Sequence, residues 1–328
     1  MVVGCNPLND KYFIAVDWGT THLRAYLCQS TAHGLLLIDQ RVGPGVVKVA
    51  CGFEQSLFAC IAPWRAKYGV LPVYLTGQIT SSIGWQETPY LACPLSLKQI
   101  IDASVSLTVQ DHPLTFLAGT QCSLQNNLQD VMRGEELQIA GFLQQHQQYQ
   151  QGRVLICLPG THTKWVLLEN GEIQCFKTAM TGELFDLLCH QSVLIQAANC
   201  DGEFDWSAFE QGCQLTLDSD SGNFVHGVFS VRTMQLSGAL NSLQARAYLS
   251  GVLVGSDVRA ARYAKEWQLN NTTQVVVVGT EQLRRCFTLA LSRIGVTCQD
   301  YPIQEATLSG FNYLSQLLQQ AVNATHPA

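Results

Sequence analysis

Charged residues are scarce in this sequence: Asp, Glu, Lys and Arg together make up 13% of its 328 residues. The 19 basic residues are outnumbered by 25 acidic ones and form no continuous basic block, which argues against a nucleic acid or a membrane as partner. Hydrophobic residues reach 47%, which excludes a disordered chain and supplies a sizeable core. At roughly 100–200 residues per domain, the length predicts two domains or one large one.

Long apolar runs and paired cysteines are also missing. No stretch approaches the roughly 18 residues that a membrane-spanning helix needs, and residues 1–10 have neither the basic nor the apolar region of a secretory signal. The 13 cysteines include no Cys-x-x-Cys pair, and several lie in apolar runs, so we expect reduced, mostly buried thiols in a cytoplasmic protein. The eight histidines show no metal-binding spacing, which argues against zinc.

What the sequence does contain is a strand–turn–strand pattern that occurs twice. In the first copy, the apolar strand 12–16 runs into Asp17, and a turn of small residues leads to the alternating strand 22–27 and a third strand at 35–38.

The second copy has a hairpin signal at Asn170-Gly171 before its last strand. Its strands are 154–158, 164–168 and 173–177. Gly19 and Gly160 hold matching positions in the two turns. The pattern predicts a duplicated architecture, with chance similarity between two common hairpins as the alternative.

Segments of helical periodicity follow each copy. They are 54–67, 134–148, 241–268, 281–292 and 309–322, and short strands are expected at 73–75, 114–117 and 275–278. The Gln-rich stretch 144–151 is polar and of low complexity, so we take it as a linker. The predicted domains are therefore 1–148 and 149–328.

Asp17-Trp18-Gly19-Thr20-Thr21 has the composition of a phosphate-binding turn. A carboxylate at a strand end can hold a hydrated magnesium ion, and Gly19 allows a sharp turn close to a ligand. The amides and hydroxyls of Thr20 and Thr21 can point at phosphate oxygens. The alternative is an ordinary hairpin whose Asp caps the turn.

A second candidate clamp is the turn Gly160-Thr161-His162-Thr163-Lys164. Its hydroxyls and amides would meet other phosphates, and Lys164 would add positive charge. The alternative is a Gly-Thr turn with a surface lysine. Further along, the strand 275–278 ends in Gly279-Thr280 before a helix, which is a common arrangement for a nucleotide at a strand's carboxyl edge.

Two carboxylates, Glu135 and Glu136, stand in the first turn of a helix, directly after Arg133-Gly134. One interpretation is a carboxylate base beside an arginine that binds an anionic substrate. The other is simple compensation of the helix dipole. The loop with Trp85 and Tyr90 is suited either to a sugar site or to core packing.

Taken together, these segments resemble the 2-dehydro-3-deoxygalactonokinase family, which are sugar-acid kinases of the actin, hexokinase and Hsp70 ATPase superfamily. The similar stretches are DWGTTHLRAYL (17–27), GWQETPYLACP (84–94), DVMRGEELQIAG (130–141), LPGTHTKWV (158–166), MTGELFDLL (180–188) and YLSGVLVGSDV (248–258).

The resemblance implies an α/β fold of two ribonuclease-H-like domains with the active site in the cleft between them. It implies ATP-dependent phosphorylation of the 6-hydroxyl of 2-dehydro-3-deoxy-D-galactonate, with Mg²⁺ held by Asp17. Glu135 takes the place of the catalytic Asp of related kinases and is the expected base, with Glu136 as runner-up. The expected nucleotide-binding residues are Gly19, Thr20, Thr21, Gly160, Thr161, His162, Lys164, Gly251, Gly279 and Thr280. For the sugar acid they are Arg24, Trp85, Tyr90 and Arg133.

The chain departs from the family pattern at Gly77–Ser82, where the family more often has Gly-Met and a long polar residue in place of Ser82. This departure leaves the sugar acid open between the galactonate derivative and another 2-keto-3-deoxy acid, such as the gluconate epimer. A non-catalytic ATP- or sugar-binding regulator of the same fold is a more distant alternative. The oligomeric state is also open, with a homodimer among the options.

Overall fold

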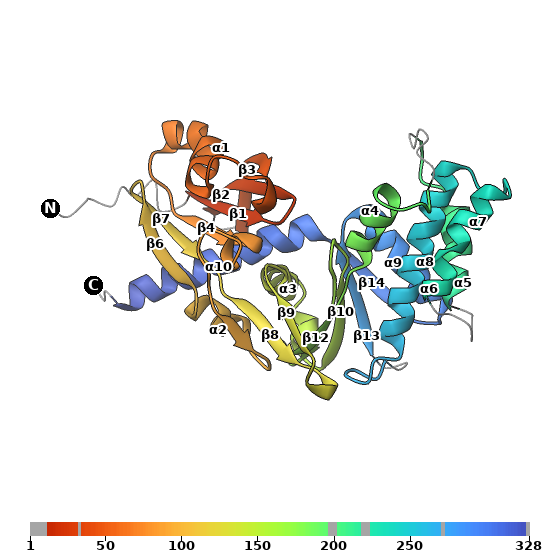
Figure 1. Cartoon of the computed structure of the whole chain (residues 1–328). Coiled ribbons are helices and arrows are strands. Elements are labelled where there is room, and N and C mark those ends of the chain that lie inside the picture. The colour runs from red at the N-terminus through yellow and green to blue at the C-terminus, as the bar shows by residue number, and fades with distance from the viewer. Residues whose placement is uncertain (1–11, 32–33, 196–201, 218–223, 270–272, 326–328) are drawn as a thin grey trace. The chain divides into compact units, whose positions relative to one another are not determined.

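The computed structural model describes residues 12–31, 34–195, 202–217, 224–269 and 273–325, which Figure 1 draws as ribbon. The chain divides into two compact units. Unit 1 consists of Met1–Gln151, Asn170–Gln174 and Gln304–Ala328, and unit 2 consists of Gly152–Glu169 and Cys175–Ile303.

The main sheet of unit 1 has six strands in the order β3-β2-β1-β4-β7-β6. They are β1 (Tyr12–Trp18), β2 (His22–Thr31), β3 (Gly34–Pro44), β4 (Val73–Thr76), β6 (Val105–Val109) and β7 (His112–Phe116). Strands β1, β2 and β3 pair antiparallel, whereas β4 and β7 run parallel to β1. Parallel strands end at the same edge of the sheet, so the residues that follow β1 and β4 are neighbours.

Helices cover both faces of this sheet. They are α1 (Phe53–Tyr68), α2 (Leu97–Asp102), α3 (Glu135–Gln145) and α10 (Ile303–Thr325). Side chains of β1 alternate between two cores: Ile14 and Val16 pack with α1, and Phe13 and Ala15 pack with Phe311 of α10. Figure 1 shows α10, in blue, lying along these strands. A small second sheet holds β5 (Tyr90–Ala92), β8 (Gly119–Ser123) and β9 (Gln129–Met132).

Unit 2 repeats the arrangement with the strand order β12-β11-β10-β13-β14. These are β10 (Arg153–Leu158), β11 (Thr163–Glu169), β12 (Glu172–Ala179), β13 (Gln274–Gly279) and β14 (Cys298–Pro302). Strand β10 pairs antiparallel with β11 and parallel with β13, as β1 does with β2 and β4. The duplicated pair of ribonuclease-H-like units, which is the actin-like ATPase fold, is therefore confirmed.

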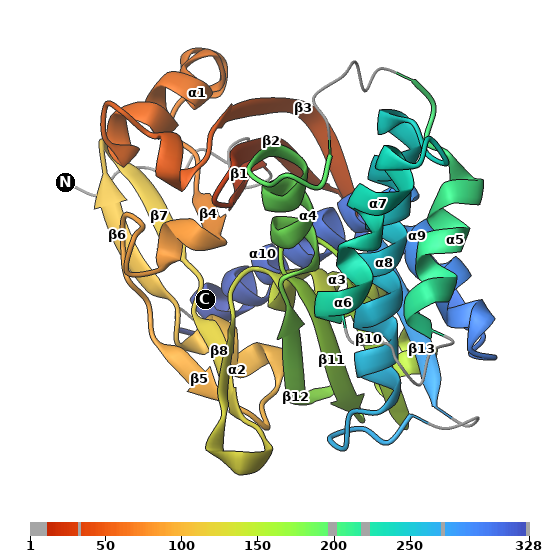
Figure 2. The same ribbon diagram turned by 45° about the vertical axis from the view of Figure 1, so that its right-hand side comes forward.

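A helical layer packs on the sheet of unit 2 (Figure 2). It contains α4 (Thr181–His190), α5 (Trp206–Leu217), α6 (Phe224–Val228), α7 (Ser230–Leu236), α8 (Ser242–Arg262) and α9 (Glu281–Arg293). Asn241 caps α8 through its side chain, which accepts a hydrogen bond from the Gln244 amide. No helix in the part of the chain described here is both long and apolar enough to cross a membrane.

Three expectations differ from the structure. The stretch 144–151 is not an open linker, because it folds into a 3₁₀ turn, η4 (Gln147–Gln150), whose Tyr149 is buried against Phe142. The helix expected over 241–268 ends at Arg262. The terminal helix α10 belongs to unit 1 rather than to the second domain, because Phe311 and Leu314 complete the core beneath β1.

Candidate active site

Asp17 lies near the carboxyl end of β1, beside β4. Its side chain is 21% exposed, and its Oδ2 atom lies 3.5 Å from Nη1 of Arg24, the residue directly opposite on β2. Burial raises the pKa of Asp17, and the Arg24 guanidinium acts in the opposite direction. A cation near this carboxylate therefore favours its charged form.

Asp17 offers a single carboxylate to a possible magnesium ion. Mg²⁺ is usually bound through one or two carboxylates together with waters and substrate phosphates, not by a cage made of protein alone. Across the described residues, no group of three His, Cys, Asp or Glu side chains could hold a metal ion. A magnesium ion here would share its coordination between Asp17 and the substrate.

The first predicted phosphate turn, Gly19–Thr21, is fixed through its carbonyl groups. The amides of Gly45, Val46 and Val47 donate to the carbonyls of Thr21, Gly19 and Thr20 over 3.1, 3.0 and 3.4 Å. These contacts turn the carbonyl groups toward the 45–47 segment, and the side chains of Thr20 and Thr21 are exposed. The Gly19 amide is used within the turn, where it donates to the His22 carbonyl at 3.0 Å, so the groups that suit an anion are the hydroxyls of Thr20 and Thr21.

Two glycines bring the start of α3 to Asp17. A Cβ atom on Gly77 would lie 3.4 Å from Oδ1 of Asp17, and one on Gly134 would lie 3.2 Å from Cα of Gly77. Both residues have positive φ, +91° and +114°, which favours glycine. The ends of β1 and β4 and the residue before Glu135 therefore meet at one edge of the unit 1 sheet.

Glu135 and Glu136 have different environments. Glu136 is 3% exposed; its Oε1 accepts a hydrogen bond from the Thr120 hydroxyl at 2.8 Å, and its Oε2 accepts one from the Gly134 amide at 2.6 Å. Burial raises the pKa of Glu136 against these hydrogen bonds. Glu135 is only partly buried, and its Oε2 lies 3.3 Å from the Arg133 amide nitrogen. Glu136 therefore serves the helix start, and Glu135 is the more accessible carboxylate.

Arg133 was expected to bind the sugar acid, but its guanidinium is directed to the protein itself. The residue is 7% exposed and lies with its Cζ atom 4.1 Å from the centre of the Tyr90 ring. Its donors reach the hydroxyls of Thr80, Thr88 and Tyr90 and the carbonyl of Thr88. Because its hydrogen bonds are made inside unit 1, the structure supports a structural task for Arg133, with Tyr90 as one of its partners.

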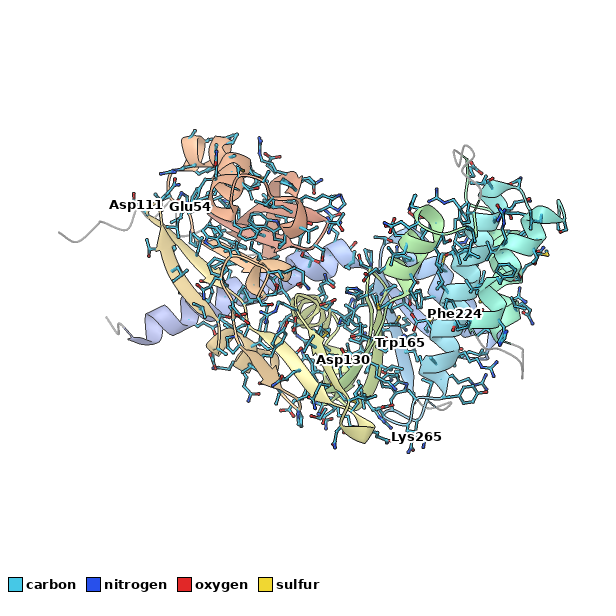
Figure 3. All side chains as sticks on the ribbon, viewed as in Figure 1. Glu54, Asp111, Asp130, Trp165, Phe224 and Lys265 are labelled. Atoms are coloured by element: carbon cyan, nitrogen blue, oxygen red, sulfur yellow. The ribbon has the colours of Figure 1, made fainter. Side chains whose placement is uncertain are left out.

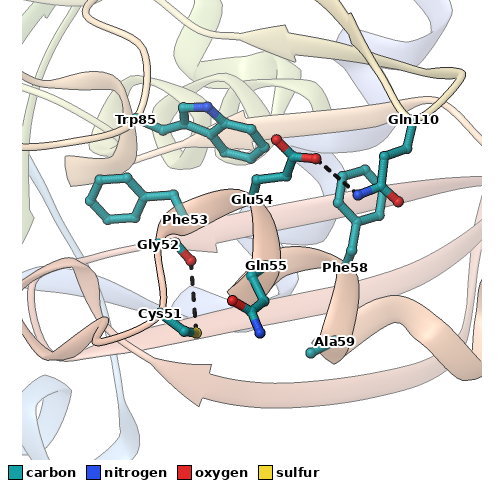
Figure 4. Close-up of a pocket in the computed structure, with 9 residues that line it drawn as sticks. All are labelled: Cys51, Gly52, Phe53, Glu54, Gln55, Phe58, Ala59, Trp85 and Gln110. Carbon is teal, nitrogen blue, oxygen red and sulfur yellow. Dashed lines mark hydrogen bonds between the residues drawn. The ribbon is translucent and has the colours of Figure 1, made fainter.

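Trp85 lines a surface pocket of about 560 Å³ at the start of α1 (Figure 4). Its ring packs edge-on against Phe116, with centroids 5.7 Å apart. Beside it, the Gln110 amide donates to Glu54 at 2.9 Å. Of the described residues that line this pocket, the charged one is Glu54, which would repel an anionic sugar acid. The pocket therefore does not support the expected sugar-acid contact of Trp85.

In unit 2, the second predicted phosphate turn is packed against the start of α4. A Cβ atom on Gly182 would lie 2.3 Å from the Gly160 carbonyl oxygen, and the Glu183 amide donates to the Thr161 carbonyl at 2.9 Å. The His162 ring contacts the Glu183 carboxylate. Lys164 is 6% exposed and donates to the Thr178 hydroxyl at 2.7 Å, so it is not the surface lysine of the alternative interpretation.

A pocket of about 190 Å³ joins this turn to the predicted adenosine side within unit 2. Gly160, Thr163, Thr181, Gly182 and Thr280 line it together with apolar side chains.

Two of the glycines expected to contact the nucleotide lie close to neighbouring atoms of unit 2. A Cβ atom on Gly251 would lie 2.0 Å from the Phe209 carbonyl oxygen, so this glycine allows α8 to approach α5. The expectation that Gly251 contacts the nucleotide is therefore not supported. Gly279 is buried, and a Cβ atom on it would lie 3.0 Å from the Pro159 ring.

Asp257, on α8, is a buried carboxylate that the motifs did not indicate. It accepts hydrogen bonds from Trp165 Nε1 at 2.8 Å and from Thr181 Oγ1 at 2.6 Å, and Figure 3 labels Trp165. Burial raises the pKa of Asp257 to about 6 even though these donors oppose the shift. Because Thr181 lines the pocket, Asp257 supports the wall of the candidate nucleotide site.

Comparisons with known proteins agree on one family. Its sequence model, described as 2-keto-3-deoxy-galactonokinase, matches residues 17–314. A protein of Rhizobium meliloti (strain 1021) named "Probable 2-dehydro-3-deoxygalactonokinase" is 30% identical over 304 residues, which cover 92% of this chain and 95% of that protein. The 2-dehydro-3-deoxygalactonokinase of Escherichia coli (strain K12) is 32% identical over 251 residues, which cover 76% of this chain and 80% of that protein.

A solved structure agrees with these sequence comparisons. The crystal structure from Sinorhizobium meliloti, described by the same enzyme name, has a TM-score of 0.77 at 28% identity. The match covers 97% of this chain and 100% of that one.

Proposed function

This chain belongs to the 2-keto-3-deoxy-galactonokinase family, and we propose that it transfers the γ-phosphoryl group of ATP to the 6-hydroxyl of 2-dehydro-3-deoxy-D-galactonate. The observation that carries the assignment to residues is the meeting of Asp17, Gly77 and Gly134 at one edge of the unit 1 sheet. It supports a site in which a metal-organising carboxylate and a general base stand together.

In this proposal, Glu135 accepts the proton of the attacking hydroxyl. The hydroxyl oxygen forms a bond to the γ-phosphorus while the bond from that phosphorus to the β–γ bridging oxygen breaks, which leaves ADP. Such transfer depends mainly on positioning and on neutralising charge. When bound, Mg²⁺ would neutralise part of the phosphate charge, and Asp17 would hold it.

In unit 1 we assign phosphate binding to the turn Gly19–Thr21, and in unit 2 to the turn Gly160–Thr161. The pocket lined by Gly160 and Thr280 would take the nucleoside, since its apolar walls suit a flat ring. Arg24, whose side chain is 52% exposed beside Asp17, is our candidate for the sugar carboxylate, because guanidinium groups bind carboxylates through two hydrogen bonds. Tyr90 and Trp85 would affect the sugar-acid site indirectly, through the segment 77–90 to which both belong. We place this activity in the cytoplasm, where unpaired thiols stay reduced.

A coupled assay of ADP release tests the proposal. The purified enzyme is offered 2-dehydro-3-deoxy-D-galactonate and its gluconate-derived epimer, each with ATP and a magnesium titration. We expect turnover with the galactonate derivative and a clear preference over the epimer.

The variant Asp17→Asn should lose most of the turnover and respond differently to magnesium, whereas Asp111→Asn, a change at an exposed turn, should behave as the wild type. A stronger response to the epimer would reassign the substrate. ATP binding without turnover on any sugar acid would favour a regulator.

A further inference from the structure

Arg133 connects two segments that the proposed kinase reaction needs. We propose that Arg133 is a positioning residue: its guanidinium holds the segment 77–90 against the start of α3, and so fixes how the sugar acid faces Glu135. The inference rests on the proposed function, but it assigns to Arg133 a task other than contact with the substrate.

The contacts of the guanidinium all lead to one segment. Nη1 donates to the Thr80 hydroxyl at 2.7 Å and also reaches the Thr88 hydroxyl. Nη2 donates to the Thr88 carbonyl at 3.0 Å, and Nε donates to the Tyr90 hydroxyl at 3.2 Å. Four donors of one rigid fork are thus used on three residues, which a lysine could not reproduce.

The partners of Arg133 pass the restraint on to the site. The Thr80 hydroxyl lies 3.1 Å from the Gly77 carbonyl, and the Thr88 hydroxyl lies 2.9 Å from the Leu117 carbonyl. Gly77 in turn stands next to Asp17 and Gly134. The hydrogen bonds of Arg133 therefore lead back, through Thr80 and Gly77, to the same edge of the unit 1 sheet. They connect the segment 77–90 to Gly134, the residue before Glu135.

The acceptors recorded for this guanidinium are hydroxyl and carbonyl oxygens, all of them neutral. A buried cation acts more strongly on its neighbours than an exposed one, because the protein interior screens charge less than water does. At 7% exposure, Arg133 lowers the pKa of the nearby Glu136 carboxyl group, against the effect of burial. The fork of Arg133 therefore fixes the segment 77–90, and its charge acts on the start of α3.

The test separates geometry from charge with three variants. Arg133→Lys keeps the charge and loses the fork, and Thr88→Val keeps the arginine and removes a partner. Arg65→Lys is the control at a partly exposed arginine of unit 1, which donates to Gln110. Hydrogen–deuterium exchange is measured on peptides covering 77–90, with peptides covering 154–168 as internal reference. The ratio of kcat/KM for the two epimeric sugar acids is measured in parallel.

We expect exchange within 77–90 to rise about 10- to 100-fold in Arg133→Lys, which is the change that loss of a charge-assisted hydrogen bond implies. Thr88→Val should raise exchange within 77–90 by a smaller factor. Exchange within 154–168, and exchange in the Arg65→Lys control, should equal that of the wild type. The preference between epimers should fall in step with the rise in exchange. Overall destabilisation would not change the preference between the epimers, since it lowers the activity toward both acids alike.

Unchanged exchange in both variants would overturn the proposal. So would a rise in exchange that leaves the epimer ratio and KM as they were, because the network would then serve the fold alone. If Arg133→Lys does not fold, Thr88→Val and Tyr90→Phe decide the question by the same two readouts. If the wild type phosphorylates neither acid, the proposed function fails, and the exchange data still show whether the network holds the segment.

Discussion

Glu135 and Glu136 are neighbours in the sequence, yet their surroundings give them different tasks. Glu136 is buried and accepts two hydrogen bonds, from Thr120 and from the Gly134 amide. Glu135, one position earlier on the helix, points about 100° away and is more accessible. Accessibility to a substrate hydroxyl, rather than acidity alone, supports Glu135 as the base.

Replacing Glu135 by Gln should lower kcat by about 10²–10⁴-fold with near-normal ATP affinity, since size is kept and basicity is lost. Glu136→Gln is the control. It leaves one buried donor without its carboxylate, so it should lower the free energy of unfolding by about 1–3 kcal/mol and affect kcat less. Single-turnover kinetics and thermal melts measure both. A folded but inactive Glu136→Gln together with an active Glu135→Gln would move the base by one residue.

The buried carboxyl group of Asp257 makes stability depend on pH. Its pKa is about 6 in the folded chain and near 3.8 when unfolded, so the folded state holds the proton more tightly. The stabilisation is therefore present below about pH 4 and is lost as the pH rises through 6. At 1.36 kcal/mol per pKa unit, the loss is about 2–3 kcal/mol between pH 4 and pH 7.

The variant Asp257→Asn removes this titration. Denaturant unfolding at several pH values should show the wild type losing its advantage over Asp257→Asn as the pH rises across that range. Parallel stability curves for the two proteins would show that Asp257 does not titrate as described.

Sequence patterns indicated the parts of the candidate site whose signal is local. Asp17 and its glycine–threonine turn follow one another directly, so composition alone suggested them. The tasks of Arg133 and Asp257 depend on distant partners: Arg133 meets residues 43 to 53 positions away, and Asp257 meets Thr181 and Trp165 over 76 and 92 positions. No local pattern records such pairs, so Arg133 was taken for a substrate ligand and Asp257 was overlooked.

At the scale of whole elements, apolar runs and alternating patterns located the two three-stranded meanders, and short apolar runs located the strands β4, β7 and β13. The helices α2, α4, α5, α6 and α7 were not predicted. A capping signal was nevertheless present for α5, because the Asp205 carboxylate accepts a hydrogen bond from the Ala208 amide at 2.9 Å. On α8, the resemblance implied a nucleotide contact for Gly251. Gly251 and Gly255 instead face Phe209 and Cys213 of α5, so close helix packing accounts for them.

The packing of α4 on the second phosphate turn gives a prediction for one glycine. In Gly182→Ala, the new methyl group would lie 2.3 Å from the Gly160 carbonyl oxygen, so the turn or the helix must shift. Such overpacking costs about 1–3 kcal/mol, and we expect KM for ATP to rise by roughly tenfold. Steady-state kinetics at varied ATP measure it.

The matched control is Gly227→Ala in α6, where the added carbon would meet side chains at an ordinary 3.6 Å. It should leave KM for ATP unchanged. Equal effects of the two substitutions would show that the contact between α4 and the turn is not what shapes the ATP site.

For the whole molecule, the chain passes between the two units at 151–152, 169–170, 174–175 and 303–304. Domain closure around ligands is a common way for kinases to exclude water. We expect the radius of gyration to fall when the sugar acid and a non-hydrolysable ATP analogue are both present. Small-angle scattering measures this, with each ligand alone as control. An unchanged radius would argue against closure.

The return of α10 to unit 1 has a consequence for how the protein is made. Unit 1 begins to emerge from the ribosome first, but Phe311 and Leu314, which cover the strand β1 from below, are synthesised only after all of unit 2. At about 5–20 residues per second, the nascent unit waits roughly ten to thirty seconds for its last helix. During that interval part of an apolar face of its sheet is uncovered, and exposed surface of this kind makes a nascent chain prone to aggregate. Unit 2, in contrast, can fold as soon as β14 has been translated.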